Sequence, residues 1–67
     1  IDVLVEGLSP RQATKPGIMQ MQGRTDKNVI VNIDVKTQRV MPYSLVGQIV
    51  PVKIIRARAH SLAGALS

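Results

Sequence analysis

One stretch decides the fold: QIVPVKIIRA, residues 48–57, the longest run of β-type residues in the chain. Every second residue from Val50 to Ile54 is apolar, and this period of two predicts a strand with one buried face. Ile54 and Ile55 are both apolar, so the pattern changes phase there, which predicts a β-bulge or a sharp bend. Small barrels close through such bends. Pro51 has no N–H to donate, so we expect a gap in strand pairing on its side.

Four more segments show strand signals around this stretch. Alternating apolar residues predict strands over residues 1–8, 18–24, 28–33 and 61–66. Between them lie a polar loop over 9–17, a tight turn over 25–27, and a predicted loop over 34–44 that could hold a short extra strand. No segment has the pattern of an amphipathic helix, so we predict an all-β fold, a small five-stranded antiparallel barrel. The predicted core is Val3, Val5, Met19, Met21, Val29, Val31, Val50, Val52, Ile54 and Leu62.

The composition excludes most kinds of catalytic site. The chain has 67 residues, enough for a single small domain, and it has no cysteine, which removes disulfides, iron–sulfur clusters and thiolate zinc sites. Its one histidine, His60, precedes Ser61, and adjacent residues on a strand point to opposite faces, which is poor geometry for a base and a nucleophile. The four acidic residues lie in four different segments. We therefore expect that this chain alone is not an enzyme and holds no metal or cofactor.

The sequence shows no signal for membrane insertion or secretion. No apolar run approaches the ~20 residues that a membrane-spanning helix needs, so we expect no membrane contact of that kind. The start has neither an initiator methionine nor the pattern of a signal peptide. We interpret the sequence as a piece cut from a longer chain.

The charge balance points to a polyanionic partner. Nine Lys and Arg residues against four Asp and Glu give a net charge of +5, and such an excess suggests nucleic acid or an anionic membrane surface. Tyr43 is the only aromatic residue, so stacking on aromatic rings contributes little and recognition would rest on phosphates, sugars, polar side chains and backbone groups. The alternative for any single Lys or Arg is that it merely solvates the surface.

The turn between the second and third predicted strands is the densest polar cluster. Arg24, Thr25, Lys27 and Asn28 offer two cations, a hydroxyl and an amide that can donate to a phosphate or a ribose hydroxyl. In the alternative interpretation, Asp26 pairs with Lys27 or Arg24 and Asn28 only satisfies the turn geometry.

Four short motifs together resemble one family. VLVEG at 3–7, GRTDKN at 23–28, LVGQIV at 45–50 and SLAG at 61–64 occur in this order. Together they resemble the TRAM domain that ends the radical-SAM tRNA methylthiotransferases, in particular the branch that makes 2-methylthio-N6-isopentenyladenosine. The resemblance runs from about residue 2 to residue 66 and covers essentially the whole chain, so residues 1–67 are expected to be one TRAM domain.

The resemblance implies a small antiparallel barrel related to oligonucleotide-binding folds, which holds tRNA for a catalytic domain upstream. The iron–sulfur clusters and S-adenosylmethionine would then belong to the missing part of a cytoplasmic enzyme, and the domain is expected to be a monomer. Gly23, Arg24, Thr25 and Asn28 match the loop motif of the family. The loop over 34–43 is longer than usual, and the alanines of the last strand replace polar residues. The candidate RNA-binding residues are Arg24, Thr25, Lys27, Asn28, Lys36, Arg39, Lys53, Arg56, Arg58 and His60.

Two other functions fit the same residues. The chain could be the TRAM domain of another tRNA- or rRNA-modifying enzyme, such as a uridine methyltransferase. It could instead have a mainly structural role, in which the barrel packs against its own catalytic domain. In that case the apolar residues outside the core phase, such as Leu4, Ile30 and Ile55, would form the interface.

Overall fold

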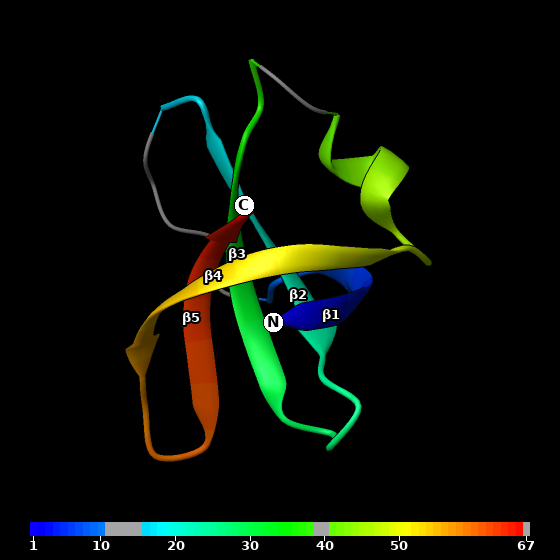
Figure 1. The fold of residues 1–67 in the computed structure, drawn as a ribbon. Coiled ribbons are helices and arrows are strands. Elements are labelled where there is room, and N and C mark those ends of the chain that lie inside the picture. Colours follow the sequence, from blue (N-terminus) through cyan, green and yellow to red (C-terminus); the bar gives the residue numbers. More distant parts are fainter. Residues whose placement is uncertain (11–15, 39–40, 67) are drawn as a thin grey trace.

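The computed structural model describes residues 1–10, 16–38 and 41–66. These residues form five strands and one short 3-10 turn (Figure 1). The elements in chain order are β1 (Asp2–Leu8), β2 (Ile18–Arg24), β3 (Ile30–Lys36), η1 (Pro42–Leu45), β4 (Ile49–Ala57) and β5 (Ser61–Leu66). No helix among these residues has the length and apolar character needed to cross a membrane. The predicted all-β class is confirmed.

The strands pair in the order β1-β2-β3-β5-β4, and β4 pairs back to β1, so the sheet closes into a barrel. Four pairings are antiparallel, but β3 and β5 run parallel. The prediction of a fully antiparallel barrel is therefore wrong. The reason is geometric, because neighbours in an antiparallel ring must alternate in direction and an odd number of strands cannot do so all the way round. Figure 1 shows β5 beside β3, with β4 crossing in front of them.

The third strand differs from its predicted bounds. It begins at Ile30 instead of residue 28 and continues to Lys36, because the turn after β2 extends through Val29. As a result, Val29 is 37% exposed and is not a core residue, whereas Val35 is fully buried. Residues 34–36 therefore continue β3, and the later part of the predicted loop contains η1, with Pro42 at its start.

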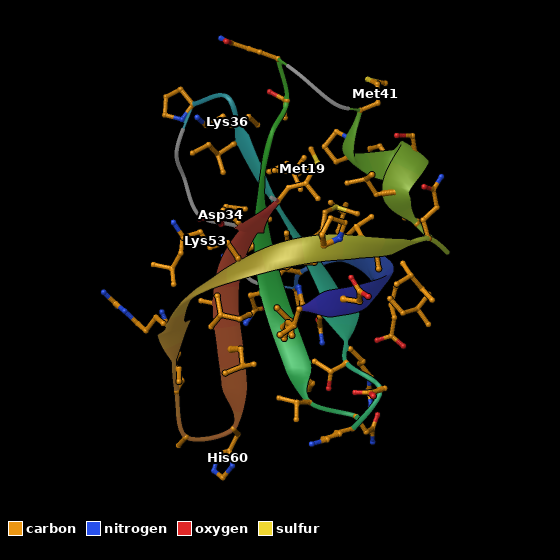
Figure 2. All side chains as sticks on the ribbon, viewed as in Figure 1. Met19, Asp34, Lys36, Met41, Lys53 and His60 are labelled. Atoms are coloured by element: carbon orange, nitrogen blue, oxygen red, sulfur yellow. The ribbon has the colours of Figure 1, made fainter. Side chains whose placement is uncertain are left out.

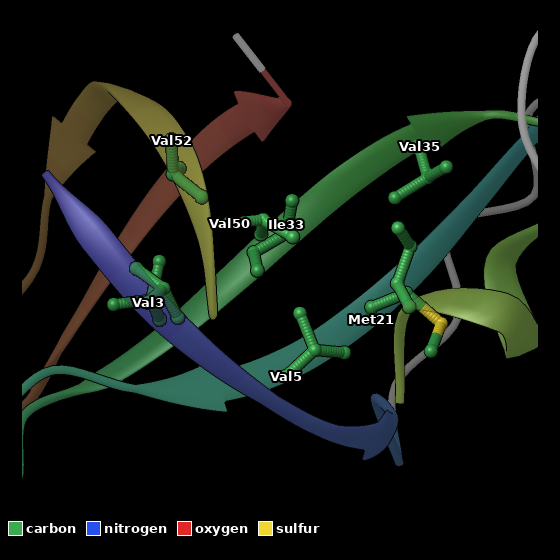
Figure 3. Packing of buried hydrophobic residues seen from close by; sticks show 9 residues of the cluster. Val3, Val5, Met21, Ile33, Val35, Val50 and Val52 are labelled. Atoms are coloured by element: carbon green, nitrogen blue, oxygen red, sulfur yellow. The ribbon is translucent and has the colours of Figure 1, made fainter. Parts of the chain in front are cut away.

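The core fills the barrel with aliphatic side chains from β1, β2, β3 and β4 and from η1 (Figure 3). Its buried members are Val3, Val5, Met21, Val31, Ile33, Val35, Leu45, Val50 and Val52. The predicted core residues Ile54 and Leu62 are partly buried against this cluster, and Met19 is half-buried. Leu45 joins the core from η1, outside every strand.

The bend predicted in β4 is present. Ile54 lies opposite Gly64 of β5 and Arg56 lies opposite Ala63, so Ile55 is the extra residue of a bulge. Pro51 lies opposite Asp2 of β1. On its other side, the described pairing with β5 begins with Val52 opposite Leu66, so the pairing gap expected at Pro51 falls outside the described residues of β5.

Two glycines allow neighbouring strands to approach closely. A Cβ atom at Gly23 would overlap the carbonyl oxygen of Leu4 and would lie 2.6 Å from a methyl carbon of Val3. A Cβ atom at Gly64 would lie 2.5 Å from the carbonyl oxygen of Lys53. Both contacts are closer than real Cβ atoms allow, so any larger residue would force the barrel wall apart.

Candidate nucleic-acid interface

The turn between β2 and β3 is built by its own side chains. The N–H of Asn28 donates to the carbonyl oxygen of Thr25 at 3.0 Å, and Asn28 has a left-handed φ of 64°. A three-residue hairpin loop commonly contains such a residue, and Asn tolerates it better than most. The hydroxyl oxygen of Thr25 accepts hydrogen bonds from the N–H groups of Lys27 and Val29, each at 3.2 Å. Thr25 and Asn28 therefore hold the turn together.

Arg24 is held by two neighbours. Its Nε donates to Oε1 of Glu6 at 3.1 Å, and its Nη1 donates to Oδ1 of Asn28 at 2.8 Å. The partner of Arg24 is thus a carboxylate on β1, and not Asp26 as in the alternative interpretation of this turn. Since this ion pair is exposed at the surface, it contributes only about 0–1 kcal/mol to stability. Its effect here is to orient Arg24 along the barrel wall.

A different group of cations lies along β4 and the connection to β5. Lys53 lies opposite Ala65 and Arg56 lies opposite Ala63, and residues directly opposite in a sheet share one face. The N–H of Arg58 donates to the carbonyl oxygen of Ser61 at 2.8 Å, which closes the connection. Figure 2 shows Lys53 on β4 and His60 at the tip of the connection. We call Lys53, Arg56, Arg58 and His60 the basic row.

Amide side chains cover the outer face of the β2–β3 hairpin. Gln22 lies opposite Asn32, and Gln20 lies opposite Asp34, whose Oδ1 accepts a hydrogen bond from Nε2 of Gln20 at 3.2 Å. Asn32 in turn lies opposite Ala63 of β5. One line of outward-facing residues therefore runs from the amides across Ala63 to the basic row.

An open groove of about 350 Å³ follows this line. Its floor contains small residues of β5, one wall carries the amides, and the connection between β4 and β5 closes one end. The lining residues are Ser9, Pro10, Gln20, Gln22, Ile30, Asn32, Arg58, His60, Ser61 and Ala63. A surface of this kind offers both donors and acceptors beside positive charge.

The structure divides the predicted site residues into three groups. Arg58 and His60 of the basic row line the groove, and Arg56 and Lys53 follow on β4, opposite Ala63 and Ala65. Arg24, Thr25 and Asn28 line a second hollow, together with Asp2, Glu6 and Asp26. Lys27 projects from the same turn. Lys36 lies at the end of β3 remote from His60 (Figure 2), and Arg39 lies outside the described residues.

Sequence reasoning missed the uncharged half of the groove. Gln20, Gln22 and Asn32 line the groove, but none of them is among the candidate residues predicted from the sequence. The available signal was the recurrence of amides on the outward phase of two neighbouring strands. The alanines of the last strand, which replace the family's polar residues, weaken the expectation of RNA contact from that strand; in the structure Ala63 lines the groove.

Comparison with known proteins adds the family. The TRAM domain family matches residues 1–66. The chain is 45% identical over 65 residues to the tRNA-2-methylthio-N(6)-dimethylallyladenosine synthase of Syntrophobacter fumaroxidans. That match covers 97% of this chain but only 12% of the relative. No solved structure matches the chain. Since the family match extends over nearly every residue, the chain belongs to the TRAM domain family.

Proposed function

We propose that the chain is the RNA-binding module of a tRNA methylthiotransferase and that it holds tRNA while the remainder of the enzyme performs the reaction. The family match and the similarity to a tRNA-modifying synthase support this parent. A TRAM domain of a uridine methyltransferase is the weaker alternative, because the curated relative is a methylthiotransferase. The chain has no cysteine, so the iron–sulfur clusters and S-adenosylmethionine expected in such an enzyme would be held elsewhere.

The line from the amides across Ala63 to the basic row is the observation that carries the proposal. Five-stranded oligonucleotide-binding barrels bind their ligands on strands 2 and 3, between the loop after strand 1 and the loop after strand 4. Here the groove occupies that place, with Ser9 and Pro10 from the first loop and Arg58 and His60 from the second.

In this arrangement an RNA strand would follow β5. The guanidinium group of Arg58, which lines the groove, would neutralise its phosphates. Arg56 and Lys53 would extend this contact beyond the groove, because they lie opposite Ala63 and Ala65 of β5. The side-chain amides of Gln22 and Asn32 would face the sugars and base edges from the other side. An amide both donates and accepts, so it can hydrogen-bond a ribose 2′-hydroxyl without an aromatic platform.

The proposed contact surface leaves out Arg24, Thr25 and Asn28. Their side chains already hydrogen-bond within the turn, and carboxylates of Glu6 and Asp26 line the same hollow. Contacts from Lys27, Lys36 and Arg39 remain predictions.

A kinetic experiment on the full-length enzyme tests whether the module binds RNA or takes part in the chemistry. Replacing Arg56 and Arg58 with alanine should raise the KM for tRNA about tenfold or more, because each charge-assisted hydrogen bond contributes about 1.5–3 kcal/mol. The value of kcat should stay within about twofold of the wild type. Replacing Gln38 with alanine is the control, because Gln38 is exposed and does not line the groove, and it should change neither constant. A fall in kcat with an unchanged KM would contradict the proposal.

A further inference from the structure

The outer face of β1 carries an apolar pair surrounded by carboxylates. Leu4 of β1 lies directly opposite Ile49 of β4, and these side chains are 42% and 69% exposed. Both line an open hollow of about 540 Å³, together with Asp2, Glu6 and Asp26. We call these five residues the acid-rimmed patch.

The acid-rimmed patch has the wrong charge for nucleic acid. Three of the four acidic residues of a chain with a net charge of +5 lie in it. Glu6 pairs with Arg24, which lines the same hollow, and Lys27 lines a neighbouring hollow with Asp2 and Asp26. Among the described residues, neither aspartate forms an ion pair, so the hollow itself holds three carboxylates against one cation. Their negative charge would repel phosphates, whereas Arg58 and His60 of the basic row line a separate groove.

The chemistry of the patch suits a protein surface. An exposed apolar centre with a polar rim is the ordinary anatomy of a protein–protein interface. The unpaired carboxylates of the rim call for Lys or Arg side chains on the partner, arranged around an apolar residue that enters the hollow. The match covers only 12% of the methylthiotransferase relative, so a parent of that size contains ample further surface to supply this partner.

We propose that the acid-rimmed patch docks this domain onto the remainder of its own polypeptide, on a surface with an apolar centre and a basic rim. The proposal rests on the methylthiotransferase-like parent but not on RNA binding by the groove. Docking through β1 and the start of β4 would leave the groove over β2, β3 and β5 open to a ligand. The interface expected from sequence is thereby changed: Leu4 is kept, Ile30 lines the groove, and Ile55 lies at the bulge.

The chain offers a matched pair of variants for the test. Ile49 and Ile55 are the same residue on the same strand, with exposures of 69% and 67%. Ile49→Lys places a cation in the patch, where it removes the apolar contact and repels a basic partner. Ile55→Lys adds the same charge next to Arg56 in the sequence, outside the patch. If a new surface charge lowered the stability of the fold by itself, Ile55→Lys would lower it at least as much as Ile49→Lys.

Limited proteolysis of the full-length enzyme reports docking. When opening is fast relative to cleavage, the rate of release follows the population of the undocked state. Ile49→Lys should release the domain about tenfold faster than wild type, the effect expected of a central interface residue. Ile55→Lys should release it at the wild-type rate. The double variant Asp2→Asn/Asp26→Asn should release it about threefold faster at low salt, and at 1 M salt this difference should disappear because charges are screened within about 3 Å.

Each outcome decides the proposal. Faster release for Ile49→Lys but not for Ile55→Lys, with tRNA affinity unchanged, supports docking through the patch. This outcome does not depend on whether the groove binds RNA. Equal release rates for the two isoleucine variants would overturn it. A loss of tRNA affinity in Ile49→Lys without faster release would also overturn it, because the patch would then contact RNA.

Discussion

The turn after β2 and the strand β4 both carry cations, but the two regions use them differently. In the turn, Arg24 lies within four residues of Lys27 and Asn28, yet its guanidinium is bound by Glu6 and Asn28. On β4, Lys53 and Arg56 are spaced along a strand, and the register places them opposite Ala65 and Ala63 of β5, of which Ala63 lines the groove. Clustering in the sequence therefore says little about which charges are available to a ligand. Cross-strand register decides this, because it sets which residues share an outer face.

The largest expected effect is on stability, at the two glycines where neighbouring strands approach closely. Gly64→Ala should remove most of the stability of the domain, about 3 kcal/mol or more, because the new methyl group would overlap the backbone of β4. Gly23→Ala should act similarly beneath the turn, where Leu4 and Val3 lie too close. Gly7→Ala is the control, since a Cβ atom there meets nothing within 4 Å. Urea denaturation measures all three, and a mild effect of Gly64→Ala would mean that the barrel wall is looser than described.

The uncharged wall of the groove should matter next. Replacing Gln22 and Asn32 together with alanine should weaken RNA binding by about 1–3 kcal/mol, since each hydrogen bond contributes about 0.5–1.5 kcal/mol. Binding of DNA of the same sequence should fall less, because DNA lacks the 2′-hydroxyl that the amides would bind. Competition between matched RNA and DNA oligonucleotides measures this difference. An unchanged RNA-to-DNA preference would show that the amides do not bind the sugars.

A smaller effect separates structure from binding in the turn. Asn28→Ala should destabilise the domain by about 1 kcal/mol, because alanine is strained at a φ of 64°, whereas Asn28→Gly should keep most of the stability. Neither variant should change the affinity for tRNA by more than about twofold if the side chain serves only the turn. Thermal unfolding and a binding titration on the same samples check both statements. Weaker tRNA binding by the stable glycine variant would assign Asn28 to the interface.

Local patterns predicted the features that depend on one strand at a time. The strand over 48–57 and its bulge followed from the alternation that breaks at Ile54 and Ile55. The end of the turn could not be predicted in this way. Val29 is apolar and in phase with Val31, but its hydrogen bonds with Thr25 place it in the loop. A period of two cannot distinguish a turn residue from the first residue of a strand.

Features that depend on several strands could not be predicted from the pattern of any single strand. The parallel pairing of β3 with β5 follows from closing an odd number of strands, which only a count of the completed ring reveals. The ion pair of Arg24 with Glu6 joins residues 18 positions apart, and the groove needs the registers of three strand pairs at once. Local patterns therefore identify Arg58 and His60 as candidate residues but do not predict the groove that they line.

The salt dependence of tRNA binding compares the two regions most directly. One double variant replaces Arg56 and Arg58 with alanine, and the other replaces Arg24 and Lys27, so each lowers the net charge of +5 by two. In the full-length enzyme, a plot of log affinity against log salt should lose about 1.4–1.8 in slope for the first variant, as expected for two phosphate contacts. The second should lose less than half of that. An equal or larger loss for Arg24 and Lys27 would contradict the account, because the turn would then be the region that binds RNA.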